Sequence, residues 1–153
     1  MSLVGRFLIE DNKVRTDSIE CTSLRFNCRR CGAFCCRLGG PVVSQKDLMR
    51  LRRSVPKIDH CTETVALGPH VVTMLVSKPS GECILFSKRN KKQGVCSKYR
   101  YRPDVCRTYP FELVKEGTRL TLRVLPCTGL NRKKGRLIDE KFVRNHLRFA
   151  TVT

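Results

Sequence analysis

The chain has 153 residues, 31 of them Lys or Arg and 13 of them Asp or Glu, which gives a formal net charge of +18. This charge excludes an electrically balanced scaffold, and a hydrophobic content of 41% is enough for one core of ordinary domain size. Aromatic residues make up 7% and Trp is absent, so we expect a thin core that needs another source of stability.

The N-terminal third predicts a hairpin, a cysteine loop and a short helix. Strands over 5–10 and 13–17 flank Asp11-Asn12, a pair of turn formers, so residues 1–25 are expected to form an N-terminal hairpin. A cysteine-rich loop covers 28–36. Ser44 followed by Asp47 three residues later is typical of a helix start, and Pro56 ends the apolar stripe.

The middle of the chain predicts a second hairpin and one helical turn. The run 70–76 is apolar and β-branched, and Pro79-Ser80-Gly81 indicates a turn into a second strand over 82–86. Arg102-Pro103-Asp104 places Pro at the first position of a helical turn, which Pro110 ends. Met49 and Met74 lie on apolar stripes and are expected to fill the core.

The C-terminal part predicts a third hairpin and a helix. Strands over 111–115 and 119–125 are joined through Glu116-Gly117, and residues 139–150 have the apolar spacing of an amphipathic helix. We expect one α+β domain over 1–153, built from short hairpins and helices around a cysteine-ligated metal or iron–sulfur site. Its chelating core covers 26–129, and a basic loop with the C-terminal helix covers 130–153.

Ten cysteines are the most distinctive feature of the composition. The first twelve residues do not resemble a secretory signal, because Arg6, Glu10 and Asp11 interrupt a short apolar stretch. We therefore expect a soluble cytoplasmic protein with reduced thiols, without a membrane-spanning segment or a membrane partner. Five disulfides, in an oxidising compartment or in a thermophile, are the alternative.

Eight of the cysteines have the spacing of metal ligands. Four lie in the pattern C-x2-C-x3-C-C, and four follow at long intervals. Soft thiolates favour zinc, Cu(I) or iron–sulfur clusters and exclude hard cations such as calcium. The eight thiols are enough for two four-sulfur sites, although one of the adjacent Cys35 and Cys36 could only pack. The candidate ligands are Cys28, Cys31, Cys35, Cys36, Cys83, Cys96, Cys106 and Cys127.

Nearby arginines would offset the charge of such a site. Zinc and an oxidised four-iron cluster, each with four thiolates, both carry about −2. Neighbouring guanidinium groups also favour the thiolate form. The arginines are Arg29, Arg30, Arg37, Arg102 and Arg107, and a solvated basic surface is the alternative interpretation of each.

Two segments resemble the YkgJ-like cysteine-cluster family, a zinc- or iron-chelating domain with a CxxCxxCC core. Residues 26–36 read FNCRRCGAFCC, and residues 94–113 read GVCSKYRYRPDVCRTYPFEL, similar to the family's pattern of Cys, Tyr, Arg-Pro, Cys-Arg and aromatic-Pro-Phe. The resemblance spans about 26–129 and implies metal chelation through the same cysteines, without implying a particular metal or reaction. Cys21 and Cys61 fall outside the pattern and are expected to be buried or free thiols. His60, His70 and His146 match no family position.

Three basic runs suggest a polyanionic partner such as RNA or single-stranded DNA. Residues 98–102 interleave Tyr with Lys and Arg, an arrangement that suits phosphates and stacked bases, while 88–92 and 132–136 are basic without rings. A solvated basic face is the alternative. No phosphate loop, HExxH or GxSxG motif is present, so the sequence predicts no particular reaction, and the oligomeric state stays open.

Overall fold

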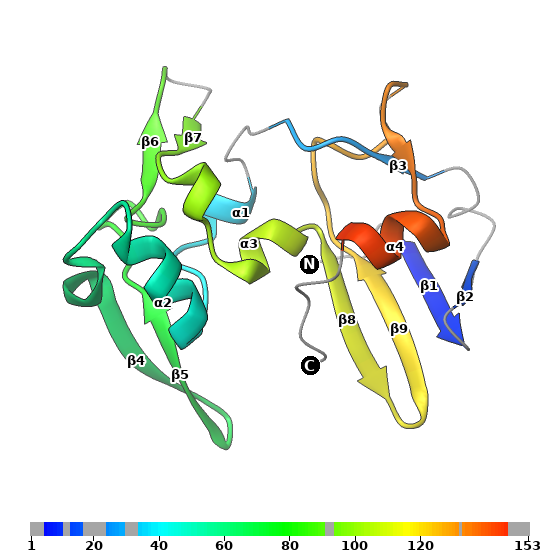
Figure 1. The fold of residues 1–153 in the computed structure, drawn as a ribbon, viewed down its shortest axis with the longest axis horizontal. Helices are drawn as coiled ribbons and strands as arrows, with labels where there is room; N and C mark the ends of the chain where they lie inside the picture. The colour runs from blue at the N-terminus through cyan, green and yellow to red at the C-terminus, as the bar shows by residue number, and fades with distance from the viewer. Residues whose placement is uncertain are drawn as a thin grey trace. The chain divides into compact units, whose positions relative to one another are not determined.

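A computed structural model describes residues 5–10, 13–16, 24–29, 34–90, 94–131 and 133–146. The chain divides into two compact units, which we treat separately (Figure 1). Unit 1 comprises 1–29 and 108–153, and unit 2 comprises 30–107. Helices and strands occur in both units, so the predicted α+β class is confirmed, whereas the single-domain organisation stays a prediction.

Unit 1 is built on a four-stranded antiparallel sheet with the order β2-β1-β9-β8. Gly117, at a φ of +65°, makes the turn between β8 and β9, a backbone conformation that glycine adopts without steric cost. The predicted N-terminal and third hairpins are confirmed. The strands are β1 (Gly5–Glu10), β2 (Lys13–Thr16), β8 (Phe111–Glu116) and β9 (Arg119–Val124).

One face of this sheet is covered by an aromatic core. The rings of Phe26, Phe111 and Phe142 meet edge to face, with centroids 5.1 to 6.2 Å apart. They come from β3 (Arg25–Phe26), from β8 and from α4 (Glu140–His146), and β3 pairs with β10 (Arg136–Leu137). The C-terminal helix is confirmed up to His146, and its predicted remainder lies outside the described residues.

The described part of unit 2 contains three short helices, two 3-10 turns and two separate hairpins. Ser44 caps α2 by accepting a hydrogen bond from the Asp47 amide, as predicted, and the Asp47 carboxylate accepts one from the Ser44 amide. The helices are α1 (Phe34–Arg37), α2 (Gln45–Arg52), η2 (Ile58–Cys61), η3 (Tyr99–Tyr101) and α3 (Asp104–Thr108). The strands are β4 (Thr62–Leu67), β5 (His70–Leu75), β6 (Phe86–Lys88) and β7 (Gly94–Cys96).

The predicted pairing of 70–76 with 82–86 is confirmed only next to its turn, and the main partner of β5 is a different strand. β5 pairs along its whole length with β4, which precedes it, because Gly68 at a φ of +58° allows a tight turn into His70. The segment 82–86 meets 76–78 through the Ser77–Cys83 bridge and through hydrogen bonds from the Lys78 amide to the Glu82 carbonyl and from the Ile84 amide to the Val76 carbonyl. The Lys78 side chain also donates to the carbonyl of Phe86, where β6 begins. Met49 is 66% exposed, so its expected role as a core residue is wrong.

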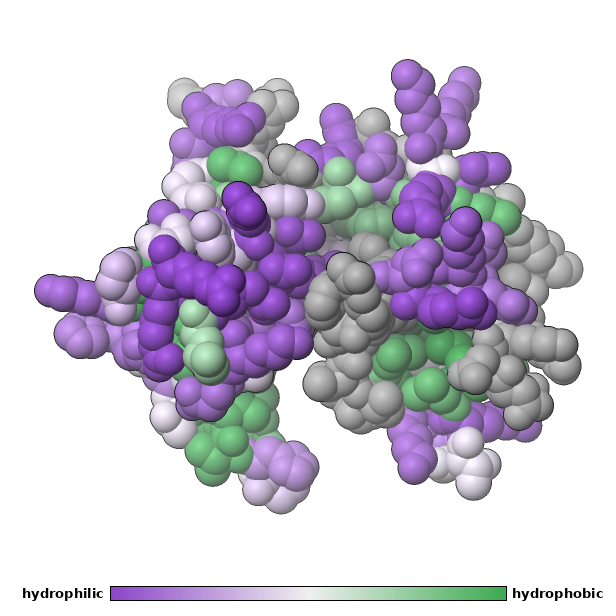
Figure 2. Space-filling view, in the orientation of Figure 1, coloured by the Kyte–Doolittle hydropathy of each residue, from purple (hydrophilic) through white to green (hydrophobic). Residues whose placement is uncertain are grey.

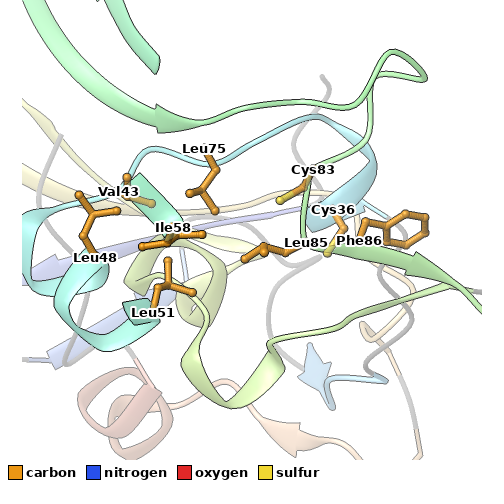
Figure 3. Close-up of a cluster of buried hydrophobic side chains, with 9 residues drawn as sticks. All are labelled: Cys36, Val43, Leu48, Leu51, Ile58, Leu75, Cys83, Leu85 and Phe86. Atoms are coloured by element: carbon orange, nitrogen blue, oxygen red, sulfur yellow. The ribbon is translucent and has the colours of Figure 1, made fainter. Parts of the chain in front are cut away.

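The core of unit 2 brings apolar side chains against two thiols. Leu51, Ile58 and Leu75 are almost fully buried at one end of this cluster. Cys36 and Cys83 lie at the other end, beside Leu85 and Phe86 (Figure 3). The core of this unit therefore continues directly into its cysteine site.

Candidate metal centre

Five of the eight predicted ligands are described in unit 2, where contacts and electrostatic interactions link their side chains. Two others, Cys28 and Cys127, belong to unit 1, and Cys31 lies outside the described residues. All eight cysteines that the structure describes are free thiols, so none of these eight forms a disulfide as the alternative interpretation required. The five of unit 2 are Cys35, Cys36, Cys83, Cys96 and Cys106; we call them the thiol cluster.

Backbone hydrogen bonds bring the segments of the thiol cluster together. Cys35 and Cys36 are neighbours on α1, and the Cys36 carbonyl accepts a hydrogen bond of 2.8 Å from the Cys83 amide. Cys96 is the last residue of β7 and pairs with Phe86 of β6. Phe86 follows Cys83 by three residues, so this pairing brings Cys96 towards Cys83. Cys106 lies in α3, and its amide donates a hydrogen bond of 3.0 Å to the Pro103 carbonyl in the first turn of that helix.

The sulfur atoms of adjacent Cys35 and Cys36 approach each other to 3.9 Å. Cys36 also forms a side-chain hydrogen bond with Cys96, so the two neighbours on α1 serve one cluster. Cys106 lies close enough to three other thiols of the cluster for their charges to raise its pKa; these are Cys35, Cys83 and Cys96. Within the described ranges, no three Cys, His, Asp or Glu side chains have the arrangement of a completed metal site.

Hydrogen bonds from the Cys36 thiol favour the thiolate at its two neighbours. The bond to Cys96 is the main reason that the pKa of Cys96 falls to about 7, and Arg102 lowers this pKa further. The bond to Cys35 lowers the pKa of Cys35. The pKa of Cys36 itself is raised, because its proton is shared with these two acceptors and its side chain is buried.

Burial acts in the opposite direction on the remaining two thiols. Loss of hydration raises the pKa of Cys83 and of Cys106, and the neighbouring sulfurs raise both further. A thiol in such surroundings deprotonates readily only when a positive charge replaces the lost water. A cation that binds sulfur would offset this cost of ionising the two thiols.

Arg102 is the basic residue that acts on most of the thiol cluster. Its charge lowers the pKa of Cys35, Cys96 and Cys106. The guanidinium lies 3.7 Å from the centroid of the Tyr99 ring and donates a hydrogen bond of 2.8 Å to the Tyr99 carbonyl. The side chain of Arg102 is thus held in place by the turn that precedes α3.

A network of ion pairs attaches α3, and with it Cys106, to α2. The Asp47 carboxylate is buried and pairs with Arg50, and its Oδ1 accepts a hydrogen bond of 3.0 Å from the Asp104 amide. Arg50 also donates a bond of 2.8 Å to the Asp104 carboxylate. Arg107, 3.9 Å from the same carboxylate, has a lowered pKa because it is partly buried beside Arg50 and Arg102. The sequence indicated only the capping role of Asp47.

The two candidate ligands of unit 1, Cys28 and Cys127, lie next to a close backbone approach between 27 and 129. The Asn27 amide donates 2.9 Å to the Gly129 carbonyl, and the Gly129 amide contacts the Cys127 sulfur at 3.4 Å. An added Cβ at Gly129 would lie 2.6 Å from the Asn27 carbonyl oxygen, so only glycine permits this approach. Cys28 is exposed, whereas Cys127 packs against the core of unit 1.

The remaining residues that the sequence singled out lie outside the thiol cluster. Cys61 is half-buried and packs against the core of unit 2, and His60 and His70 are exposed. The Tyr109 hydroxyl donates a hydrogen bond of 2.6 Å to the Pro126 carbonyl in unit 1. Cys21 and the side chain of His146 lie outside the description. No helix in the described part of the chain is long and apolar enough to cross a membrane.

Comparison with known proteins agrees with the cysteine pattern. Residues 27–135 match the model of the CxxCxxCC family, whose description reads "Putative zinc- or iron-chelating domain". The chain is also similar to an uncharacterized protein of Methanocaldococcus jannaschii, with 28% identity over 142 residues that cover 88% of this chain and 74% of that protein. No solved structure matches the chain.

Proposed function

Because the chain belongs to the CxxCxxCC family of zinc- or iron-chelating domains, we propose that its thiol cluster binds one zinc ion or one iron–sulfur cluster. The observation that carries this proposal is the convergence of five cysteines from four separate segments in one place in unit 2. Thiols are soft donors, so they suit zinc and iron–sulfur centres and not magnesium or calcium. The proposal assigns metal binding and no reaction.

The sulfur separation between the two α1 cysteines of the thiol cluster is compatible with a mononuclear centre. In a tetrahedral zinc site with Zn–S bonds of about 2.3 Å, neighbouring sulfurs are about 3.8 Å apart. The Cys35–Cys36 separation of 3.9 Å is close to this edge. In a four-iron cluster each thiolate binds a different iron, which separates the cysteine sulfurs more widely. We therefore favour zinc, with the iron–sulfur cluster as the alternative.

The charge of the surroundings is compatible with a tetrathiolate centre. Such a zinc site has a formal charge of −2, and Arg102 and Lys78 are the cations that already act on these sulfurs. The thiol cluster has one sulfur more than a four-coordinate ion needs. We expect four of the five to bind the metal and the fifth to remain a neighbouring thiol.

Anaerobic purification followed by metal analysis and absorption spectroscopy tests the proposal. A zinc centre gives about one equivalent of zinc per chain and no visible colour, because a d¹⁰ ion has no such transitions. An iron–sulfur cluster gives a brown protein with a broad band near roughly 400 nm. Protein that contains neither metal after reducing, anaerobic preparation would contradict the proposal.

Serine variants identify the ligands. We expect Cys106→Ser to lose most of the bound metal, while Cys61→Ser, a matched thiol of the same unit outside the thiol cluster, keeps it. Equal metal loss in the two variants would mean that folding, and not coordination, governs metal content. Cys127→Ser tests unit 1 separately: loss of a second equivalent of metal would mean that the chain holds two sites and that Cys127 belongs to one of them.

A further inference from the structure

Unit 1 has a group of exposed cations around the pairing of β3 with β10. We call Arg25, Lys133, Lys134 and Arg136 the basic ridge. Arg25 and Arg136 belong to the paired strands, and the two lysines lie in the turn just before β10. All four residues are exposed. Figure 2 shows hydrophilic side chains standing out from the end of the unit where Figure 1 labels β3.

Two of these cations are held by contacts that leave most of their donors available. Nη1 of Arg25 donates a hydrogen bond of 3.0 Å to the Gly135 carbonyl. The guanidinium of Arg136 lies 5.9 Å from the centroid of the Phe142 ring. A guanidinium has five N–H donors, so each side chain keeps several of them for another acceptor. Holding the side chains in place also reduces the entropy lost when an anion binds.

The cations of the basic ridge have no acidic partner in the described part of the chain, whereas six other cations do. Lys46, Arg50, Arg52, Lys88, Arg107 and Arg123 each lie within 4.0 Å of a carboxylate. Among the described residues, no carboxylate pairs with any of the four ridge cations. Asp139, the first acidic residue after β10, instead accepts a hydrogen bond of 2.7 Å from the Phe142 amide at the start of α4.

The ridge also lacks an exposed apolar centre. Phe26, Ile138 and Phe142 beneath it are at most 5% exposed, and Leu137 is its one exposed large hydrophobic residue in the described structure. Protein interfaces have an apolar core, and surface helices that bind membranes insert apolar side chains. Affinity for a nucleic-acid backbone depends mainly on cations that replace its counterions. The ridge therefore fits phosphates best.

We propose that the basic ridge of unit 1 binds the phosphate backbone of single-stranded nucleic acid. The thiol cluster lies in unit 2, so this proposal does not depend on the metal. It also does not use the 98–102 run, where the sequence suggested stacking. There the Tyr99 ring is covered by Arg102, and Tyr101 packs against the core of unit 2.

Titration of the full chain with a fluorescently labelled single-stranded RNA at several salt concentrations tests the proposal. The informative variant is Lys133→Ala/Lys134→Ala, because neither lysine makes a hydrogen bond or ion pair with another residue that the structure describes. Its matched control is Lys115→Ala/Arg119→Ala, which removes the same charge from the exposed end of the β8–β9 hairpin in the same unit.

In the ridge variant we expect the slope of log Kobs against log salt to become less negative by about 1.4, since each phosphate contact to a single strand contributes about 0.7. By the same relation its affinity near 0.1 M salt should fall about 25-fold, while the control changes little. Single-stranded DNA should bind similarly, because the ridge recognises phosphate.

Three outcomes would overturn the proposal. The first is absence of RNA binding even at low salt. The second is equal loss of affinity in the ridge and control variants, which would mean that net charge and not this surface is responsible. The third is competition by polyglutamate as effective as that by unlabelled RNA, or preferential binding to anionic vesicles, which would identify an acidic protein or a lipid surface as the partner.

Discussion

Replacing Asp47 by Asn tests whether the ion-pair network between α2 and α3 stabilises unit 2. All four groups around the carboxylate are donors. The Ser44 amide and hydroxyl each donate 2.9 Å to Oδ2, while Arg50 and the Asp104 amide donate to Oδ1. The amide group of Asn has one oxygen and one NH2. An NH2 in place of Oδ1 meets two N–H donors, and an NH2 in place of Oδ2 meets the Ser44 amide, while the Ser44 hydroxyl can turn to accept from it.

The expected cost follows from these contacts. A buried donor left without a partner costs about 1 to 3 kcal/mol, and losing an N-terminal helix cap costs about 1 kcal/mol. Breaking a fully buried ion pair costs more, about 3 to 5 kcal/mol. The Arg50 side chain is 17% exposed and keeps Asp104 as a partner, so that full penalty does not apply. We expect Asp47→Asn to lower the free energy of unfolding by about 2 to 3 kcal/mol.

Urea denaturation followed by circular dichroism measures this change, and peptide-level hydrogen exchange shows whether α2 and α3 lose protection together. Asp59→Asn is the matched control, since Asp59 also pairs with an arginine but both side chains are at least 40% exposed. We expect the control to unfold like the parent protein, because exposed ion pairs contribute little. A difference between Asp47→Asn and Asp59→Asn smaller than about 0.5 kcal/mol would refute the reasoning.

Three further predictions concern the packing and the thiols. Gly40→Ala should destabilise unit 2 strongly, as judged by its melting temperature, because the new Cβ would lie 1.7 Å from the Leu75 carbonyl oxygen; an unchanged melting temperature would contradict this close approach. In metal-stripped protein near pH 7, iodoacetamide should modify Cys96 before Cys106, since the pKa of Cys96 is about 7 and that of Cys106 is raised by burial. Mass spectrometry gives the order, and modification of Cys106 before Cys96 would contradict the prediction. A strong chelator added to reduced protein should lower the melting temperature, because metal binding contributes to folding free energy; an unchanged value would argue against a structural metal.

The elements that the sequence predicted correctly are those with local causes. Ser44 and Asp47 define the start of α2 because capping involves groups only three residues apart. Gly117 defines the β8–β9 turn because the required positive φ is a property of a single residue. The cysteines also predicted thiolate ligands correctly, because the residue type alone determines the donor atom.

Long-range relations required the tertiary structure. The β-branched run at 70–76 was compatible with a partner on either side, and the structure selects the preceding strand, β4. Met49 has helical apolar spacing but is exposed, because hydrophobic pattern does not show how far a core extends around a short helix. In the same way, spacing along the chain could not show that Cys36 and Cys96 form a hydrogen bond, while Cys127 packs in unit 1. The sequence by itself determined the chemistry of the ligands and the turns between neighbouring elements. Only the tertiary structure decided which thiols meet, because that depends on contacts between segments far apart in the chain.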